Sequence, residues 1–351
     1  MFFDVEFYND SMKTEWDRFI RRAVQGNFFH TQKFFDYHPE GRFNHRHLIF
    51  RKKGHIIAVW PGAYRDEDGL KSWTSHPGSS YGGLVLRDDV DLLATHRLIK
   101  DLVDVAKEEG IERLRCTIPP LMYHRRSSDM VEFSLRRAGF KYLKQDYTQA
   151  MDLTGLPFTE RQLIAMYDSK TRTAIRKAVR EGLTIRHNLP MSGETLDEYY
   201  DILFENRKKL GVTPTHTRDE LQLLSELAPK QLEMSMAYYN GKAIAGILNF
   251  ICNERVMLEF YIAHRDEAQN LRPSPLLVHD SILRAHERGF DWYDFGISTE
   301  PENRVTWGLA SFKENFSMQG FFRNTLILDG VQEWDVNAFL PEEPKIKVDV
   351  R

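Results

Sequence analysis

Glycine landmarks recur in the two halves of this 351-residue sequence at nearly one spacing. In each half the first follows a predicted hairpin turn, the second ends a helix and the third precedes an extended segment. In order, the pairs are Gly54 with Gly241, Gly110 with Gly289, and Gly139 with Gly320, separated by 187, 179 and 181 residues. A shared offset near 180 residues indicates two copies of one structural unit.

The pattern within each copy predicts an α/β fold (α+β, with mixed sheets). The first copy reads as the hairpin Leu48–Tyr64, helix Val90–Glu109, strand Ile111–Thr117 and helix Ser128–Arg137. The second reads as the hairpin Met234–Cys252, strand Val256–Ala263, helix Ser274–Arg288 and strand Trp292–Phe295. Because a helix between two strands requires a crossover, part of each sheet should be parallel. The predicted units are residues 1–153 and 154–331, followed by a tail at 332–351.

Composition excludes several classes of protein. A net charge of −3 gives no general attraction to nucleic acid or anionic membranes. The two cysteines, Cys116 and Cys252, build neither a disulfide framework nor a zinc motif. The longest apolar run is too short to span a bilayer, and the acidic N-terminus is unlike a signal peptide, so a cytoplasmic protein is expected. His45 and His47 share one strand face, but no third ligand is evident, and no metal is predicted.

The most basic predicted element is the helix 169–181. Arg172, Arg176 and Arg180 form one stripe along it, and four apolar residues face the other way: Ala174, Ile175, Ala178 and Val179. Such a stripe is either a solvated surface or a site for phosphate, which arginine binds bidentately.

The stretch Gly289–Phe316 holds several charged and aromatic residues within a short strand, a loop and a helix. They are Asp294, Arg304, Trp307, Phe312 and Lys313. Glu259 and Tyr261 lie in an otherwise apolar strand of the same half. A carboxylate there is costly unless it is paired or used, and burial would raise its pKa towards that of a general base. The alternatives are a cleft wall, or a packed helix with a solvent-facing strand.

The tandem arrangement resembles two GNAT (N-acetyltransferase) folds in one chain, as in the FemABX-like aminoacyl and acyl transferases. The segments that carry the resemblance, which covers about residues 27 to 330, are Ser79–Gly83, Asp168–Arg172, Tyr293–Gly296 and Gly308–Lys313. It implies transfer of an acyl or aminoacyl group to an amine, for example of a cell-wall (peptidoglycan) precursor. The donor would be acyl-CoA or aminoacyl-tRNA, with no tightly bound cofactor.

The resemblance also implies where the donor binds. In the GNAT fold it lies in a wedge between two diverging parallel strands, here Val256–Ala263 and Trp292–Phe295. The loop 269–275 before the next helix has no glycine, unlike loops that bind the pyrophosphate of acetyl-CoA, which fits the FemABX-like branch better. Arg272 and Ser274 are nevertheless predicted to bind the donor, because a helix N-terminus favours an anion.

We expect the second unit to carry the transfer and the first to bind the acceptor, through Tyr81, Gly82 and Gly83. Lys313 would stabilise developing negative charge, and Asp294 or Glu259 would accept the amine proton. The residues expected to bind substrate in the second unit are Arg172, Arg176, Tyr261, Arg304, Trp307 and Phe312. Two alternatives remain: a GNAT enzyme that uses acyl-CoA to modify a small amine or sugar amine, and a non-catalytic RNA- or nucleotide-binding module.

Overall fold

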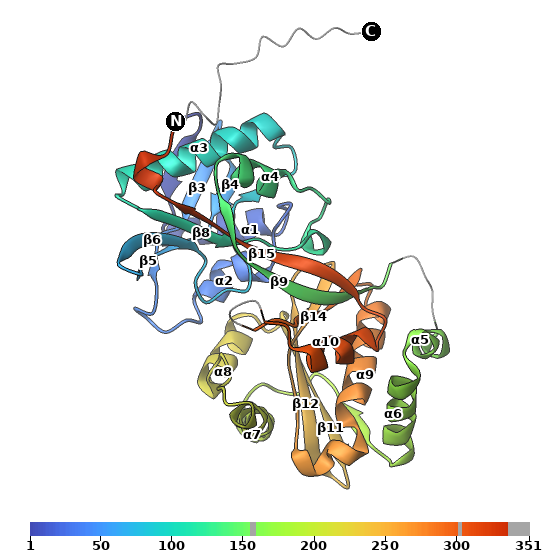
Figure 1. The fold of residues 1–351 in the computed structure, drawn as a ribbon. Helices are drawn as coiled ribbons and strands as arrows, with labels where there is room; N and C mark the ends of the chain where they lie inside the picture. The colour runs from blue at the N-terminus through green and yellow to red at the C-terminus, as the bar shows by residue number, and fades with distance from the viewer. Residues whose placement is uncertain (155–158, 301–303, 336–351) are drawn as a thin grey trace, which may run out of the picture. The chain divides into compact units, whose positions relative to one another are not determined.

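A computed structural model describes residues 1–154, 159–300 and 304–335 (Figure 1). The chain divides into two compact units. Unit 1 consists of residues 1–30, 40–145 and the chain from 324 onward, and unit 2 consists of residues 31–39 and 146–323. Within the described ranges, no helix is both long enough and apolar enough to cross a membrane.

Unit 1 contains two sheets. The antiparallel sheet has the order β1-β3-β4-β7, with β1 Asp4–Phe7, β3 Leu48–Lys52, β4 His55–Trp60 and β7 Val85–Leu86. The mixed sheet has the order β15-β8-β6-β5-β2, with β2 Asn44–His45, β5 Ala63–Glu67, β6 Leu70–Ser75, β8 Arg113–Thr117 and β15 Gln319–Asp329. Among the described strand pairs of this mixed sheet, β6 and β8 run parallel and the others antiparallel. The helices are α1 Lys13–Ile20, α3 Leu92–Glu108 and α4 Met130–Arg137, with the 3₁₀ turns Asp10–Met12, Phe28–His30, Leu121–Tyr123 and Val331–Glu333.

Unit 2 is built on one mixed sheet with the order β10-β11-β12-β13-β14-β9. Its strands are β10 Thr184–Arg186, β11 Leu232–Tyr239, β12 Lys242–Ile251, β13 Val256–His264, β14 Trp292–Ile297 and β9 Lys141–Asp152. Strands β13 and β14 are parallel, and the other neighbours are antiparallel. Both units therefore have the mixed sheet that the sequence predicts.

Helices cover both faces of the sheet of unit 2. Figure 1 shows α5, α6 and α9 on one side of β11 and β12, and α7 and α8 on the other. The helices are α2 Gln32–Phe35, α5 Glu160–Met166, α6 Ser169–Arg180, α7 Gly193–Lys209, α8 Arg218–Leu227, α9 Pro273–Glu287 and α10 Trp307–Glu314, with the 3₁₀ helix Asp266–Leu271. The α9 side holds a continuous apolar core that includes Leu163, Ile175, Leu277, Ile282 and Phe316.

The boundaries of the two units differ from the predicted segments 1–153 and 154–331, because the last strand of each copy joins the sheet of the other unit. The end of β9 pairs with β14, so this last strand of the first copy completes the sheet of unit 2. The end of β15 pairs with β8, so the last strand of the second copy completes a sheet of unit 1. Residues 31–39, which include α2, belong to unit 2 as well. Most of the predicted tail, residues 336–351, lies outside the described residues.

The first hairpin of each copy turns in the same way. Lys53 and Gly54 have φ values of 51° and 78°, and Asn240 and Gly241 have values of 49° and 78°. Two consecutive residues with positive φ are typical of the type I′ turn, which matches the twist of the flanking strands. The pairing of Gly54 with Gly241 is therefore confirmed.

The helix ends confirm the second glycine pair and correct the third. Gly110 and Gly289 have positive φ and follow α3 and α9. Gly139 also has positive φ after α4, but the residue that turns the chain after α10 is Ser317, at φ 62°. Gly320 lies inside β15, where an added Cβ would come within 2.0 Å of the Tyr147 hydroxyl. The pairing of Gly139 with Gly320 was wrong, because the second glycine makes room for a side chain rather than a turn.

Candidate active site

Strands β13 and β14 separate after three paired residues. The last pair is Leu258 with Asp294, beyond which β13 continues to His264. Strand β14 bends there: its register against β9 shifts between Asp294 and Ile297, and Gly296 has φ of 70°. The wedge between two parallel strands is therefore present where the resemblance implied it.

A bulge in β13 lies beside this separation. Leu248 of β12 pairs with Tyr261, while the next residue, Asn249, pairs with Glu259. Phe260 is the extra residue, and a bulge of this kind redirects the side chains on either side of it. As a result Phe260 and Tyr261 both contact His216, at ring distances of 5.2 and 5.8 Å.

Glu259 points to the opposite face from Tyr261, towards α9. The Tyr293 hydroxyl lies 3.2 Å from the Glu259 Oε2 and 3.2 Å from the Asn249 Oδ1, and Asn249 reaches Ser281 of α9. Glu259 is only 8% exposed. Burial raises the pKa of its carboxyl to about 7, against the opposing effects of Lys313 and of the Tyr293 hydrogen bond. Near pH 7 the group therefore exchanges a proton readily.

Lys313 of α10 is 2% exposed and lies at the bend of β14. Its ammonium donates hydrogen bonds to the carbonyls of Gly296 at 2.7 Å and Ile297 at 2.8 Å. Burial lowers the pKa of Lys313 to about 8, although the charges of Glu259 and Asp294 oppose this shift. The ammonium thus lies inside unit 2, not in open solvent, and interacts electrostatically with Glu259.

Asp294 holds the bend of β14. It is fully buried and accepts hydrogen bonds from the Thr148 hydroxyl and the Gly296 amide, both at 2.8 Å. These contacts are those of a structural carboxylate, since they fix the backbone that also supplies the carbonyls bound by Lys313. Of the two predicted bases, Glu259 therefore fits the role better than Asp294.

A cavity of about 690 Å³ opens at the start of α9. It is lined by Ser169, Lys170, Thr171, Thr173, Ala174, Lys177, His264, Gln269, Arg272, Pro273, Ser274, Pro275, Phe312 and Asn315. The predicted donor residues Arg272 and Ser274 both line it, as does Phe312, the neighbour of Lys313. Ser274 also lies within hydrogen-bond distance of the His264 Nδ1, at 3.0 Å.

The start of α9 differs from the predicted start of this helix at Ser274. The helix begins at Pro273, after Arg272 in the left-handed conformation, so Ser274 lies inside the first turn. The first residues of a helix offer backbone N–H groups to an anion, but Pro273 and Pro275 have none. Binding of an anion in this cavity therefore depends largely on the side chains of Arg272, Lys170 and Lys177.

Arg172 and Arg176, which were predicted to bind substrate, do not line this cavity. They line a separate pocket of about 570 Å³ with Glu160, Arg161, Ile164 and Ala165. Arg172 donates hydrogen bonds to the carbonyls of Tyr167 and Ala165, at 2.8 and 3.3 Å. The reason is helical geometry: residues two apart on a helix point about 200° apart, so Lys170 and Arg172 face opposite ways.

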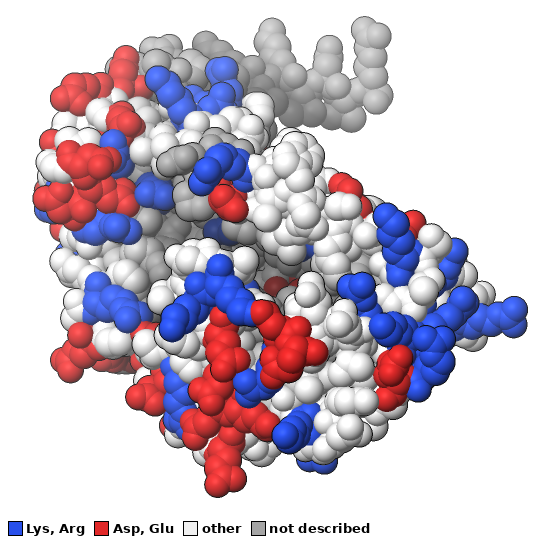
Figure 2. All heavy atoms as spheres, turned by 60° about the horizontal axis from the view of Figure 1, so that its bottom comes forward, with Lys and Arg blue, Asp and Glu red and all other residues white. Residues whose placement is uncertain are grey.

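The surface of unit 2 has its positive charge around this second pocket. Figure 2 shows Lys and Arg side chains gathered at the right-hand edge, the side on which Figure 1 draws α5 and α6. The arginines of the pocket belong to these helices. Val179, predicted to face the core, is instead 60% exposed, while Thr171 takes part in the buried face.

Three other predicted residues lie away from Glu259 and Lys313. The Arg304 side chain is 69% exposed and pairs with Glu300, and Trp307 is 77% exposed. Neither is among the residues that line the cavity at the start of α9. Tyr261 is buried on the α7 face, where its hydroxyl lies 2.9 Å from the His216 Nδ1, and the other nitrogen of that ring lies 3.0 Å from the Tyr37 hydroxyl. No sequence pattern pointed to His216 or Tyr37, because both are distant from Tyr261 along the chain.

The predicted acceptor residues of unit 1 are explained by packing. Tyr81 is buried against Tyr123 and Phe29, at ring distances of 4.7 and 5.7 Å. A Cβ on Gly82 would lie 2.2 Å from the Ser75 carbonyl oxygen, and Gly83 has φ of 88°. Gly82 is thus required by close backbone approach within unit 1 itself, and Gly83 by its positive φ.

Comparisons with known proteins agree with this geometry. Residues 169–304 match the family model described as the acetyltransferase (GNAT) domain. The structure is similar to that of FemX, with a TM-score of 0.71 and 12% identity over 94% of this chain and 98% of that one. The chain has a FemABX-like tandem GNAT fold. A search of curated protein sequences gave no match.

Two further solved structures are similar to this chain at a lower score. One is a tandem GNAT protein from the clavulanic acid biosynthesis pathway, with a TM-score of 0.52 and 10% identity over 93% of this chain and 99% of that chain. The other is L-PGS from Bacillus licheniformis, with a TM-score of 0.52 and 14% identity over 81% and 83%. The segment that matches the GNAT model includes the separated strands, Glu259 and most of the residues that line the cavity, but Phe312, Lys313 and Asn315 lie beyond its end.

Proposed function

We propose that the chain is an N-acyltransferase that moves an acyl or aminoacyl group from a phosphate-bearing donor to an amine. The observation that carries this proposal is the pair formed by Glu259 and Lys313 at the separation of β13 and β14. Burial moves the pKa of the acid up to about 7 and that of the base down to about 8. Opposite shifts of neighbouring groups towards neutral pH are typical of acid–base sites.

The chemistry requires a neutral amine, since a protonated amine is no nucleophile. Glu259 accepts the amine proton as nitrogen attacks the acyl carbonyl, and a base is most effective when its pKa is near the working pH. The ester or thioester bond to the donor then breaks, and the departing oxygen or sulfur takes up the proton. The Tyr293 hydroxyl orients the carboxylate. Lys313 supplies positive charge close by, which stabilises negative charge that develops in the transition state. Asp294 and its hydrogen bonds keep β14, and therefore the partners of Lys313, in place.

The donor's phosphates would lie in the cavity at the start of α9, where Arg272, Lys170 and Lys177 are available. Acyl-CoA and aminoacyl-tRNA both carry such phosphates. We favour aminoacyl-tRNA, since two prolines replace backbone donors at this helix start and the adjoining loop has no glycine. The acceptor would be an amine of a cell-envelope precursor or a similar molecule, as the resemblance to FemABX-like transferases implies.

The two faces of α6 allow the donors to be distinguished. Lys177 lines the donor cavity, whereas Arg172 and Arg176 line the separate pocket beside α5. A small donor bound in the cavity contacts only the first face, but a polymeric donor extends along both. Binding of aminoacyl-tRNA should therefore depend on Arg172 and Arg176, and binding of acyl-CoA should not.

The test is the binding of acyl-CoA and of aminoacyl-tRNA to three proteins at several salt concentrations. The variants are Lys177→Gln and the double variant Arg172→Gln/Arg176→Gln. With a tRNA donor, both should bind more weakly, and the double variant should show a shallower salt dependence because it makes fewer phosphate contacts. Loss in Lys177→Gln alone, with binding of acyl-CoA, would identify a CoA-dependent GNAT enzyme instead. Absence of binding and of transfer with both donors would overturn the proposal.

A further inference from the structure

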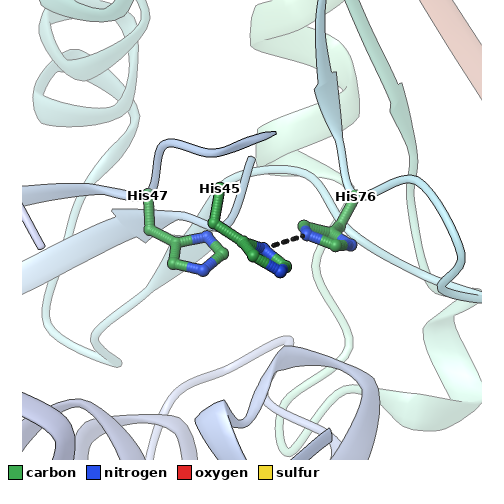
Figure 3. Close-up of side chains that lie close together, drawn as sticks. All are labelled: His45, His47 and His76. Atoms are coloured by element: carbon green, nitrogen blue, oxygen red, sulfur yellow. Dashed lines mark hydrogen bonds between the residues drawn. The ribbon is translucent and has the colours of Figure 1, made fainter. Parts of the chain in front are cut away.

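Three histidines of unit 1 lie together, although the sequence indicated only two. His45 is on β2, His47 immediately precedes β3, and His76 immediately follows β6. One ring nitrogen of each lies within 4.8 Å of the others. Figure 3 shows the three rings in a row with His45 in the middle. The centre of the His45 ring lies 5.2 Å from that of His47 and 5.0 Å from that of His76.

The sheet register brings these residues together from distant positions. His45 pairs with Ala63 of β5, and Ala63 pairs with Thr74 of β6, so the chain just after β6 returns to His45. His47 is held at the start of β5 because the Gly62 amide donates a hydrogen bond to its Nδ1, at 3.0 Å. Only the folded sheet supplies the third ring, which is why sequence spacing did not reveal it.

We propose that His45, His47 and His76 bind a divalent transition-metal ion such as Zn²⁺. Imidazole nitrogen is a preferred ligand of Zn²⁺, Ni²⁺ and Cu²⁺, whereas Mg²⁺ and Ca²⁺ prefer oxygen. The site belongs to unit 1, whereas the residues assigned to transfer belong to unit 2, and it goes beyond the proposed function. Three protein ligands leave a further position for water or a small ligand.

The geometry requires modest movement to hold the ion. Zinc–nitrogen bonds of about 2.0–2.1 Å place the nitrogens of a tetrahedral site roughly 3.3 Å apart. The His45 Nδ1 and His76 Nε2 are already 3.0 Å apart. The widest separation in the group, up to 4.8 Å, must close by about 1.5 Å. His45 is exposed on a strand of two residues, so its side chain is the one best able to move.

Metal binding would exchange hydrogen bonds for coordination. The contact between His45 and His76 would be replaced by two bonds to the ion. His47 would give up its bond from Gly62 whichever nitrogen it used, since a neutral ring that coordinates through Nε2 carries its proton on Nδ1. The Gly62 amide is therefore a direct reporter of the ion.

Binding would also restrain the segment after His76. The chain continues from His76 into Pro77–Gly83, and the Ser79 amide donates a hydrogen bond to the His76 carbonyl at 3.3 Å. An ion at the three rings would tie β2 and the start of β3 to this glycine-rich segment. We expect slower amide hydrogen exchange in residues 77–83 when the ion is bound.

The test is a calorimetric titration of the tag-free full chain after treatment with EDTA. Zn²⁺ should bind with one ion per chain, and Mg²⁺ should not bind at the same concentrations. His45→Ala and His76→Ala should each weaken Zn²⁺ binding by at least about tenfold, since the loss even of outer-shell partners costs 10–100-fold. The matched control is His55→Ala, which removes an exposed histidine of the same unit and should leave binding unchanged.

A second measurement follows the Gly62 amide resonance during the titration, and it should shift with the same stoichiometry. Zn²⁺ binding that is equal in the parent and in His45→Ala would overturn the proposal, as would equal losses in His45→Ala and His55→Ala. His45 is exposed, so its variant should fold even if His76→Ala does not, and His45→Ala alone then decides. If the proposal is overturned, the three rings form only a hydrogen-bonded stack.

Discussion

Replacing Glu259 with Gln should make the protein more stable at alkaline pH, by an amount that follows from the burial of the carboxyl. The pKa of Glu259 rises from its ordinary value of 4.5 to about 7 in the folded protein. The folded state therefore holds this proton more tightly than the unfolded state does. The resulting stabilisation is complete below pH 4.5 and is lost as pH rises through 7, a loss of about 3 kcal/mol.

At pH 5 the carboxyl of the folded parent is protonated and neutral, as Gln is. We therefore expect Glu259→Gln and the parent to have nearly the same free energy of unfolding at pH 5. At pH 8 the parent has to bury a carboxylate and the variant does not, so the variant should be more stable by about 3 kcal/mol. The neighbouring Lys313 is charged in both proteins at pH 5, so it does not disturb the comparison there.

The assay is urea denaturation of both proteins at pH 5 and pH 8. Groups that do not interact with Glu259 contribute equally to both proteins and cancel in the difference, whereas Lys313, whose pKa Glu259 raises, contributes differently to the two proteins at pH 8. Glu267→Gln, which replaces an exposed carboxylate of unit 2, is the control and should show no pH-dependent difference from the parent. A stability difference between Glu259→Gln and the parent that is the same at both pH values would refute the reasoning.

Two more predictions concern Lys313 and the glycines. Lys313→Met should lower the rate of transfer by about 10²–10³ while the protein remains folded, as measured by transfer assays and circular dichroism, and a rate within a few-fold of the parent would exclude a role in charge stabilisation. Gly82→Ala should destabilise the protein by at least about 1–3 kcal/mol, because its Cβ would lie 2.2 Å from the Ser75 carbonyl oxygen. Gly308→Ala, in α10 with open space around it, should instead stabilise by about 0.5–1 kcal/mol. Equal midpoints for both alanine variants in thermal denaturation would contradict the packing explanation.

Local signals in the sequence predicted the elements well, because those elements depend on local chemistry. The helix of residues 169–181 is observed as Ser169–Arg180, with Asp168 capping its start and Gly182 at positive φ after its end. The two hairpin turns follow from Lys53–Gly54 and Asn240–Gly241, whose conformation is set by the residues themselves. The sequence did not predict which sheet the last strand of each copy joins, because no local pattern in β9 or β15 determines its partner strand.

The orientation of α6 shows what helical periodicity in the sequence can predict and what it cannot. Periodicity separated the arginine stripe from the apolar face, of which Ile175 and Ala178 are buried and Val179 is exposed. Which of the polar faces lies at the donor cavity depends on the start of α9, where Arg272 and Ser274 meet Lys170 and Lys177. The density of positive charge in the sequence favoured the arginines as phosphate-binding residues, but the packing of α6 against α9 places Lys170 and Lys177 at the cavity.

The candidate centre combines both kinds of information. The apolar strand around Glu259 made that carboxylate a candidate from the sequence, which left open whether it faces a cleft or solvent, and in the structure burial is the largest cause of the pKa shifts of both Glu259 and Lys313. Their meeting depends on two backbone features that side-chain patterns do not encode, the bulge at Phe260 and the bend at Gly296. The bulge turns Glu259 towards α9 while Tyr261 faces His216. The bend directs the carbonyls of Gly296 and Ile297 at the Lys313 ammonium. The ammonium then interacts with the Glu259 carboxylate, so that each charge partly offsets the pKa shift that burial causes in the other group.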